Sequence, residues 1–294
     1  MTKVKEQCMT EERSRCLLLI NTLSGRGGIL NKERAKEKLE KQYGRVDVKI
    51  IENENFDMDT ACKGYDYLAI GGGDGTLNRA INYAKSKNVN LIYIPCGTLN
   101  DTYKGLRYAD KPESIDLGKV DGRYFSYVLA AGTFTPIGYN TNIKLKRAIK
   151  QLAYFLTIFR EYKTHNISAR VAAGNEEREG EYTLIMVVNS RRVFGFPFNK
   201  LYENNSGKAH LLLISSPKGI LPARAVKLFL LFFRAFFIGF NKETDTKSIT
   251  FKEIEEVTLT LSSPTDFCID GEKHILRGEN RITMHKDGIK LLYL

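Results

Sequence analysis

A glycine-rich stretch, YLAIGGGDGTLN at Tyr67–Asn78, constrains the fold more than any other part of the chain. A short apolar run precedes the glycines. After them, apolar residues recur at the spacing of one helix face, at Leu77, Ala80, Ile81 and Ala84. The glycines therefore lie at a turn from a strand to a helix, where bare backbone N–H groups and the positive end of the helix favour an anionic ligand.

Asp74 is unusual within such a loop. A carboxylate repels phosphate groups unless a cation or another positive charge lies between them, so the loop indicates a metal-bound polyphosphate. The alternative is an ordinary tight turn in which Asp74 or Thr76 caps the next helix.

Two further turns follow apolar strands in the same way. The strand expected at Cys16–Ile20 leads into Asn21-Thr22-Leu23-Ser24-Gly25, and the strand at Leu91–Ile94 leads into Pro95-Cys96-Gly97-Thr98-Leu99-Asn100-Asp101. A helix through Glu40 and a strand at Val46–Ile51 are expected between them. The first turn is not a Walker loop, because Gly-Lys-Ser/Thr is missing. In an open parallel α/β sheet such turns gather at the carboxyl edge, so the three are expected to converge there.

From about Ala130 the pattern changes to short alternating segments, which predict an antiparallel sheet or sandwich. The segments are Ile167–Ala172, Tyr182–Val188, Ala209–Ile214, Val257–Leu261, Phe267–Ile269, Arg281–His285 and Ile289–Leu294. Turns such as Asn205-Ser206-Gly207 and Asp287-Gly288 separate them. We predict an α/β domain at residues 1–128 and a β-rich domain at residues 129–294, with the last strand a candidate to return towards the first domain.

Two helices are expected among these strands. Ile143–Lys163 is basic in its first half, and Ala223–Phe240, which follows Pro222, is apolar nearly all round. Arg224, Lys227 and Arg234 project to one side of the second helix. A basic face with exposed apolar residues suits a bilayer interface, and a helix packed between the sheet and other elements is the alternative.

Composition narrows the class of partner and the compartment. The net charge of +11 and the sequence pI of about 9.3 favour acidic partners, but the basic residues are dispersed, which argues against nucleic acid. The five cysteines are scattered and never paired as CxxC, so a disulfide scaffold or a zinc site is not expected. Without an apolar run of membrane-spanning length, we expect a cytoplasmic protein that is peripheral at most.

Near the end of the chain, Asp270-Gly271-Glu272 follows the strand at Phe267–Ile269. Asp-Gly is a common hairpin turn, which needs no chemical role. The functional interpretation makes Glu272 a general base and Asp270 a positioning or metal-linked carboxylate.

Taken in order, these motifs resemble the diacylglycerol kinase catalytic-domain family, from Cys16 onwards. Gly71–Thr76 is similar to its GGDGT loop, Gly97-Thr98 with Asn100-Asp101 to its GTxND element, and Asp270-Gly271-Glu272 to its catalytic turn. Asp116-Leu117-Gly118 and Leu152-Ala153-Tyr154 also resemble family segments. GGDGT alone is shared with NAD kinases and phosphofructokinases, so the ordered set carries the resemblance.

The resemblance implies an α/β nucleotide domain, a β-sandwich domain and an active site in the cleft between them. It implies a lipid kinase that uses ATP and Mg²⁺, with Glu272 as the base and Asp270 assisting. The residues implied to hold ATP are Asn21, Thr22, Leu23, Ser24, Gly25, Gly71, Gly72, Gly73, Asp74, Gly75, Thr76, Gly97, Thr98 and Asn100. Asp74, Asp101 and Asp116 are implied to form a water-linked magnesium network.

The chain departs from the family pattern at three places. Thr22 replaces the usual proline of the first turn, and Leu99 replaces a residue that is often small. Asn205-Ser206-Gly207-Lys208 stands where the family often has Asn-Asp-Gly and a structural metal, whose ligands here would be Ser206 with Glu203 and Lys208. Because a hydroxyl is a far poorer Mg²⁺ ligand than a carboxylate, we expect this metal to be weak or absent.

Three functions remain open at this point. The leading one is a lipid kinase at an anionic membrane surface, whose acceptor is diacylglycerol or another hydroxyl lipid. An NAD kinase would share the GGDGT loop and act on a soluble dinucleotide. A regulator that binds nucleotide or lipid without catalysis is the third. The second domain also has the option of forming a homodimer through an exposed sheet edge.

Overall fold

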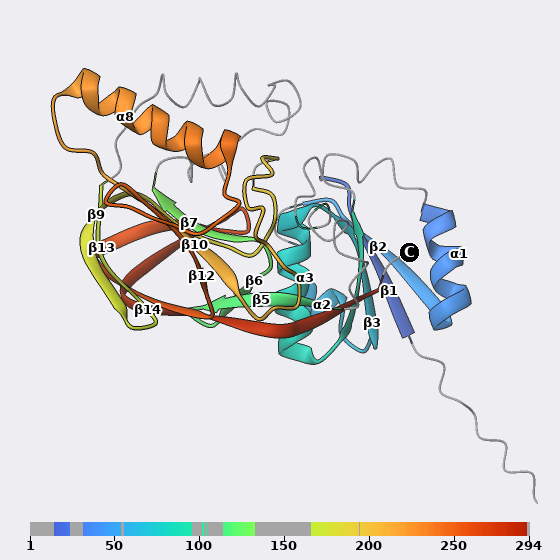
Figure 1. Ribbon diagram of the computed structural model, residues 1–294. Helices are drawn as coiled ribbons and strands as arrows, with labels where there is room; N and C mark the ends of the chain where they lie inside the picture. Colours follow the sequence, from blue (N-terminus) through green and yellow to red (C-terminus); the bar gives the residue numbers. More distant parts are fainter. Residues whose placement is uncertain are drawn as a thin grey trace, which may run out of the picture.

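The computed structural model describes residues 15–23, 32–53, 56–95, 102, 104, 114–132, 166–193 and 195–292 of the 294-residue chain. A parallel sheet flanked by helices forms one part of the molecule, and a larger β-rich part lies beside it (Figure 1). The expected combination of an α/β part followed by a β-rich part is confirmed. The sandwich arrangement and the cleft stay predictions.

The first part is a parallel sheet in the strand order β2-β1-β3-β4. Its strands are β1 (Arg15–Asn21), β2 (Arg45–Ile51), β3 (Tyr67–Gly72) and β4 (Asn90–Pro95), and its helices are α1 (Lys32–Tyr43), α2 (Met58–Ala61) and α3 (Asp74–Lys87). Strands β1, β3 and β4 are apolar nearly throughout because helices cover both faces of the sheet, whereas the edge strand β2 contains Asp47 and Lys49. Leu17 and Leu19 pack on the face covered by α3, whereas Cys16 and Leu18 pack on the face covered by α1.

The expected strands of this part are confirmed, each with one or two more residues than predicted. Helix α1 continues to Tyr43, past the expected end at Glu40. Helix α3 begins at Asp74, inside the glycine motif. Because β1 lies between β2 and β3, the ends of β1 and β3 are neighbours at the point where the strand order reverses, which is where open α/β sheets bind ligands.

The second part consists of antiparallel strands. They are β5 (Ser114–Val120), β6 (Arg123–Phe125), β7 (Val128–Gly132), β8 (Ile167–Ala173), β9 (Glu176–Val188), β10 (Ala209–Ser215), β11 (Thr244–Asp245), β12 (Ile249–Ile254), β13 (Glu256–Ile269) and β14 (Glu272–Leu292). Alternate residues of β7, β8, β9 and β13 point into one apolar core, and the other residues of β7, β9 and β10 point into a second core. The expected alternating pattern therefore reflects burial.

Two expectations about these strands are corrected. Asp287-Gly288 is not a hairpin turn: it lies within β14, where the pairing with β5 shifts register between His285 and Ile289. Val257–Leu261 and Phe267–Ile269 belong to one long strand, β13, which also shifts register in its middle. Ser126 and Tyr127 separate β6 from β7, and their backbone N–H groups donate to the Asp270 carboxylate. The N–H of Asp287 donates to Asp116 at the register shift in β14.

Strand β14 joins the two parts of the molecule. It begins at Glu272 in a hairpin with β13, continues beside β5, and ends parallel to β4, with Leu291 opposite Leu91. Figure 1 shows this strand running from the β-rich part into the parallel sheet. The second part is therefore attached to the first by a continuous strand.

Helix α8 (Leu221–Phe233) and the π-helical turn η2 (Arg234–Ile238) lie along one face of the β-rich part (Figure 1). Pro222 stands at the beginning of α8, as expected. Leu228, Phe232 and Phe236 pack on the core formed by β7, β9, β10 and β12. None of the helices within the described ranges has both the length and the apolar character needed to cross a bilayer.

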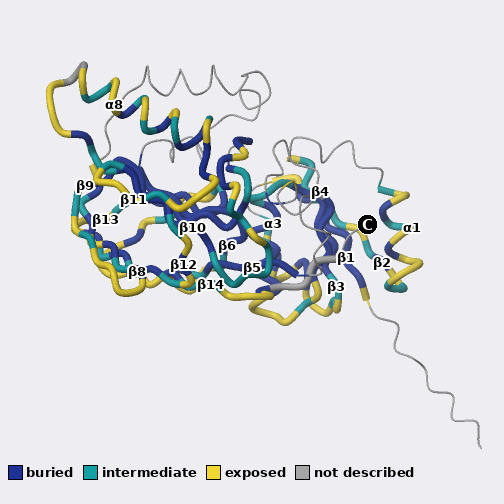
Figure 2. The backbone as a smooth tube through the Cα atoms, viewed as in Figure 1, coloured by how far each residue is buried: buried dark blue, intermediate teal, exposed yellow. Residues whose placement is uncertain are grey.

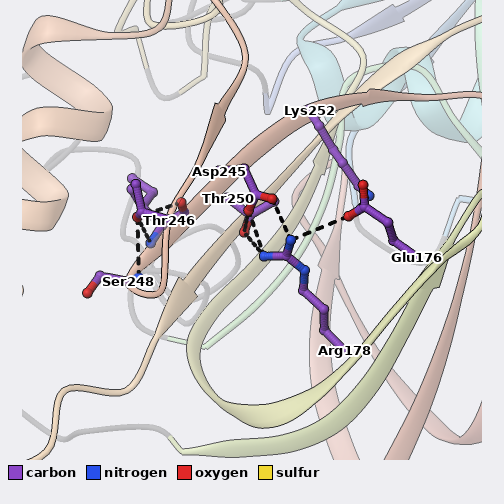
Figure 3. A network of polar contacts seen from close by, with 8 residues as sticks. Glu176, Arg178, Asp245, Thr246, Ser248, Thr250 and Lys252 are labelled. Carbon is purple, nitrogen blue, oxygen red and sulfur yellow. Dashed lines mark hydrogen bonds and ion pairs between the residues drawn. The ribbon is translucent and has the colours of Figure 1, made fainter.

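A polar network holds the short edge strand β11 (Figure 3). Nη1 of Arg178, on β9, donates to Asp245 at 2.6 Å and to Thr250 at 3.2 Å. Glu176 accepts from Lys252 at 3.1 Å. The side chains of Arg178, Asp245 and Glu176 are partly exposed, so the ion pairs among them position β11 and add little free energy of folding.

Candidate active site

The glycine loop is a tight turn that leads directly into α3. A Cβ atom at Gly72 would lie 2.5 Å from the Cβ of Thr76, so no larger residue fits there without displacing the helix start. Gly73 occupies the N-cap position and has no side chain to cap the helix, while Asp74 and Thr76 lie inside the first turn. The capping alternative therefore does not describe this loop, and the N-terminus of α3 is suited to an anionic group.

The first predicted turn lies against the glycine loop. Nδ2 of Asn21 donates to the Thr76 hydroxyl at 2.8 Å, and Oδ1 of Asn21 accepts from the backbone N–H of Leu23 at 2.9 Å. The Thr22 hydroxyl instead donates to the Ile51 carbonyl at 3.0 Å, which fixes the turn to β2. The expected convergence of the first two turns is confirmed.

Part of the predicted site lies outside the described residues. These predictions are Ser24, Gly25, Gly97, Thr98, Asn100 and Asp101, together with Leu99, Leu152-Ala153-Tyr154 and the helix at Ile143–Lys163. The third turn begins beside the second, because Pro95 pairs with Gly72. The backbone N–H of Thr102 donates to Oδ1 of Asp74 at 3.1 Å. Asp74 therefore contacts the chain just after the third turn.

The hairpin between β13 and β14 places Glu272 at the glycine loop. A Cβ atom on Gly75 would lie 3.7 Å from Oε1 of Glu272 and 3.8 Å from the carbonyl oxygen of Asp270. Glu272 is exposed, so its carboxylate is accessible from solvent. Two segments almost 200 residues apart in sequence thus bring a carboxylate beside the anion-binding end of α3.

Asp270 has very different surroundings, because it is fully buried. Its oxygens accept from the backbone N–H groups of Ser126, Tyr127 and Val128 at 2.7, 3.0 and 2.8 Å, from the Ser126 hydroxyl at 3.1 Å, and from Asn78 at 2.8 Å. Burial raises the pKa of the Asp270 carboxyl, and the donors from Ser126, Val128 and Asn78 lower it. Since the neighbours that contact these oxygens are donors, the ionised carboxylate is the form that satisfies them all.

Two asparagines of α3 complete this network, and sequence reasoning missed both. Nδ2 of Asn78 also donates to the Tyr124 carbonyl at 2.9 Å. Asn82 donates to the same carbonyl at 2.8 Å and accepts from the Tyr124 N–H at 2.8 Å. The sequence feature that indicates them is the spacing of the two asparagines, which are four residues apart and lie beside the apolar face of α3. These contacts join α3 to the segment that holds Asp270.

Asp116 belongs to a different group of contacts. It is fully buried on β5, and its carboxylate accepts from the backbone N–H of Gly207 at 2.9 Å and of Asp287 at 3.1 Å. Burial raises the pKa of Asp116, and these backbone donors oppose the rise. Nδ2 of Asn189 links the Asp116 carbonyl, at 2.7 Å, to the Ser126 carbonyl, at 3.2 Å. The structure thus places Asp116 against the Glu203–Lys208 turn, and its role in a magnesium network stays a prediction.

The Glu203–Lys208 turn is held by its own hydrogen bonds. The Ser206 hydroxyl donates to the Glu203 carbonyl at 3.1 Å and accepts from the Lys208 N–H at 3.2 Å, and Nζ of Lys208 pairs with Glu253 at 2.7 Å. The nearby Asp116 oxygens face backbone donors. This donor set does not fit a structural Mg²⁺, which needs several free oxygen ligands. Among the described residues there is also no cluster of three or more His, Cys, Asp or Glu side chains placed to hold a metal.

The fold and the site together define a two-part protein in which a β-rich part presents a glutamate to the glycine loop at the start of helix α3. Residues 15–122 match the family model of the diacylglycerol kinase catalytic domain. The resemblance predicted from the motifs is therefore confirmed: residues 15–122 are similar to a diacylglycerol kinase catalytic domain.

Comparison with individual proteins agrees with the family match. The chain is 31% identical to a diacylglycerol kinase of Staphylococcus saprophyticus, over 45% of this chain and 48% of that protein. It is 30% identical to a diacylglycerol kinase of Staphylococcus haemolyticus, over 45% of this chain and 44% of that protein. The match thus spans about half the length of these curated relatives. A solved structure from Bacillus anthracis superposes with a TM-score of 0.71 at 17% identity, covering 96% of this chain and 97% of that one, which shows a shared fold.

Proposed function

We propose that this protein is an ATP- and Mg²⁺-dependent lipid kinase that transfers the γ-phosphate to the hydroxyl group of a diacylglycerol-like lipid. The observation that carries the proposal is the position of Glu272, whose carboxylate lies beside Gly75 in the first turn of α3. The catalytic-domain match and the relatives named as diacylglycerol kinases support the same activity.

In the proposed reaction, the Glu272 carboxylate accepts the proton of the lipid hydroxyl. The resulting oxygen forms a bond to the γ-phosphorus while the bond between that phosphorus and the β,γ-bridging oxygen breaks, which releases ADP. The N-terminus of α3 and the glycine loop stabilise the phosphate charge, because phosphoryl transfer depends chiefly on positioning and charge neutralisation.

Asp74 is the described residue suited to the magnesium ion, because its carboxylate stands in the first turn of α3 beside the proposed phosphate site. The ion, when bound, supplies neutralisation of the charge on the phosphate oxygens. Asp270 acts as a positioning residue in this scheme. Its hydrogen bonds to three successive N–H groups fix the hairpin that carries Glu272.

The proposed acceptor is a membrane lipid, so we further propose that the protein works as a peripheral enzyme at the cytoplasmic face of an anionic membrane. The excess of 45 Lys and Arg residues over 34 Asp and Glu residues supports this location through attraction to anionic headgroups.

The test is phosphate transfer from labelled ATP, with Mg²⁺, into a panel of micellar hydroxyl lipids, with NAD as a soluble acceptor. We expect a labelled product that extracts into chloroform. Glu272→Gln keeps the shape of the side chain and removes the base, so it is expected to lower kcat by roughly 10²–10⁴-fold while nucleotide binding persists.

The other outcomes would assign a different function to the protein. Label on NAD alone would make it a soluble dinucleotide kinase. ATP binding without transfer to any acceptor would make it a regulator. Lipid transfer that Glu272→Gln leaves intact would remove Glu272 from the role of base.

A further inference from the structure

The outer side of α8 carries a stripe of exposed apolar residues. Val226, Leu230 and Phe233 are 60%, 58% and 38% exposed, and Ile238, in η2, is 52% exposed. Spacings of four and three residues place the first three on one side of the helix. Helix α8, which carries most of the stripe, lies at the margin of the β-rich part and contains exposed positions (Figures 1 and 2).

The core does not require this stripe. The opposite side of the helix supplies the buried residues Leu228, Phe232, Ala235 and Phe236. The outer side is also ordered by stacked rings, since Phe233 lies 6.0 Å from Phe229 and 5.1 Å from Phe237 between ring centroids. A preformed apolar surface of this kind indicates an interaction site.

The charge around the stripe identifies the chemistry of the partner. Residues 216–242 contain five basic residues and no acidic one. Lys227 is exposed on the flank of the stripe. Neither Lys227 nor Lys218 nor Lys242 forms an ion pair with another residue in the part of the chain that the structure describes, so their charges are available to an anionic partner.

We propose that the α8–η2 stripe docks this protein on an anionic lipid bilayer. The apolar side chains would enter the interface between headgroups and acyl chains, and the flanking lysines would pair with the headgroups. A second copy of the chain is a poorer occupant, because a symmetric contact would bring two basic helices together. The docking proposal rests on the proposed function only for the reason why the protein binds a membrane. Vesicle binding itself is measurable without phosphoryl transfer.

The experiment is co-sedimentation of the full chain with vesicles of phosphatidylcholine, with and without phosphatidylglycerol. We expect binding that requires phosphatidylglycerol and weakens with added salt. Leu230→Glu is expected to weaken this binding by roughly tenfold or more, and Lys227→Glu by roughly fivefold.

Two matched controls lie in the first part of the molecule. Val48→Glu replaces an apolar residue that is 38% exposed on β2, and Lys63→Glu makes the same charge change as Lys227→Glu. Both controls are expected to bind vesicles like the unmodified protein. Thermal unfolding of every variant shows whether the fold is intact.

Three results would overturn the docking proposal. One is no binding to anionic vesicles, and another is equal binding by Leu230→Glu and Val48→Glu. The third is a dimer in solution that Leu230→Glu dissociates, which would assign the stripe to a second copy.

Transfer to a short-chain diacylglycerol dispersed as monomers is expected to persist in Leu230→Glu. If the unmodified protein phosphorylates no lipid but binds vesicles through the stripe, the kinase proposal fails and the docking proposal stands.

Discussion

Two carboxylates of one hairpin have opposite environments. Asp270 is buried and receives five hydrogen bonds, whereas Glu272, two residues later, is exposed beside Gly75. Burial raises the pKa of Asp270, but its oxygens are enclosed and engaged by donors, so a substrate hydroxyl has no access to them. The contrast favours Glu272 for proton transfer and Asp270 for positioning.

Asn78 is the link between Asp270 and α3, and its removal is the sharpest test of that positioning role. In Asn78→Ala one donor to the buried Asp270 is lost, at a cost of about 1–3 kcal/mol in the free energy of unfolding. We expect kcat to fall at least tenfold with little change in the KM for ATP, because the hairpin that carries Glu272 loses its tie to the helix. Steady-state kinetics and thermal unfolding measure the two effects.

The matched control is Asn82→Ala. This change removes the two hydrogen bonds with Tyr124 and the donation from Nδ2 of Asn82 to the Asn78 carbonyl and Oδ1, at 3.0 and 3.2 Å, and it retains both partners of the hydrogen bond between Asn78 and Asp270. It is expected to cost similar stability with a much smaller change in kcat. Equal losses of kcat in both variants would show that Asn78 acts only through the stability of the fold.

At this scale the sequence identifies residues in local motifs and misses those defined by distant partners. Gly72, Asp74 and Glu272 are foreseeable because a turn or a helix start explains each of them. Asn78 is not, because its partner Asp270 is 192 residues away in sequence. Ser126 is missed for the same reason, because its partner Asp270 is 144 residues away in sequence.

Helix α3 carries the proposed phosphate site in its first turn. A substitution of Gly75 in this turn is expected to raise the stability of the protein and to lower its activity. A methyl group there meets Glu272 and Asp270 at 3.7–3.8 Å, which is ordinary van der Waals contact. Gly75→Ala is therefore expected to raise the free energy of unfolding by about 0.5–1 kcal/mol through helix propensity. The same methyl group occupies space between the loop and Glu272, so kcat/KM is expected to fall at least tenfold.

Gly174→Ala is the control, because it is expected to change stability in the opposite direction to Gly75→Ala and to leave activity unchanged. Gly174 has a φ of +60° in open space, so alanine is strained there but touches nothing. We expect lower thermal stability and unchanged activity. If Gly75→Ala instead raises stability with full activity, the reacting groups do not pass between the glycine loop and Glu272.

The elements that the sequence misassigns are those whose ends depend on tertiary contacts. Asp270-Gly271 and Asp287-Gly288 have the same local signal, yet the first is a hairpin turn and the second lies inside β14. The difference is Asp116, which accepts the N–H of Asp287 and stabilises a register shift within the strand. A dipeptide pattern contains no information about that carboxylate.

Across the whole molecule, the order of motifs predicts the architecture better than any single motif does. Three strand–turn units predict the parallel sheet, and alternation predicts the β-rich part, because both patterns reflect burial on one or two faces. The return of the last strand towards the first part, a candidate from the sequence, is observed as the pairing of β14 with β4, with Leu291 opposite Leu91. The sequence does not specify β4 as the partner, because this pairing joins two segments that are far apart in the chain.

The second core makes the stability of the whole molecule sensitive to acid through His210. This residue is buried on β10, its ring stacks on Phe251 with a centroid distance of 5.0 Å, and Asn199 donates to Nδ1 at 3.2 Å. Burial lowers the pKa of His210 from 6.5 to about 4, and Glu253 and Glu243 oppose this only partly. The neutral ring is therefore the form that the folded state holds.

The sign of the pH effect follows from this lowered pKa. The unfolded chain takes up a proton as the pH falls through 6.5, and the folded chain does not until about 4, so the contribution of His210 is complete above pH 6.5 and is lost on acidification. Between about pH 7 and about pH 5 the free energy of unfolding falls by about 2 kcal/mol through this residue.

Thermal unfolding across this range is expected to show a falling Tm for the unmodified protein and a flatter profile for His210→Gln. Burial also lowers the pKa of the more exposed His285, so His285→Gln is expected to flatten the profile less than His210→Gln does. Equal slopes in all three proteins would place the acid sensitivity elsewhere.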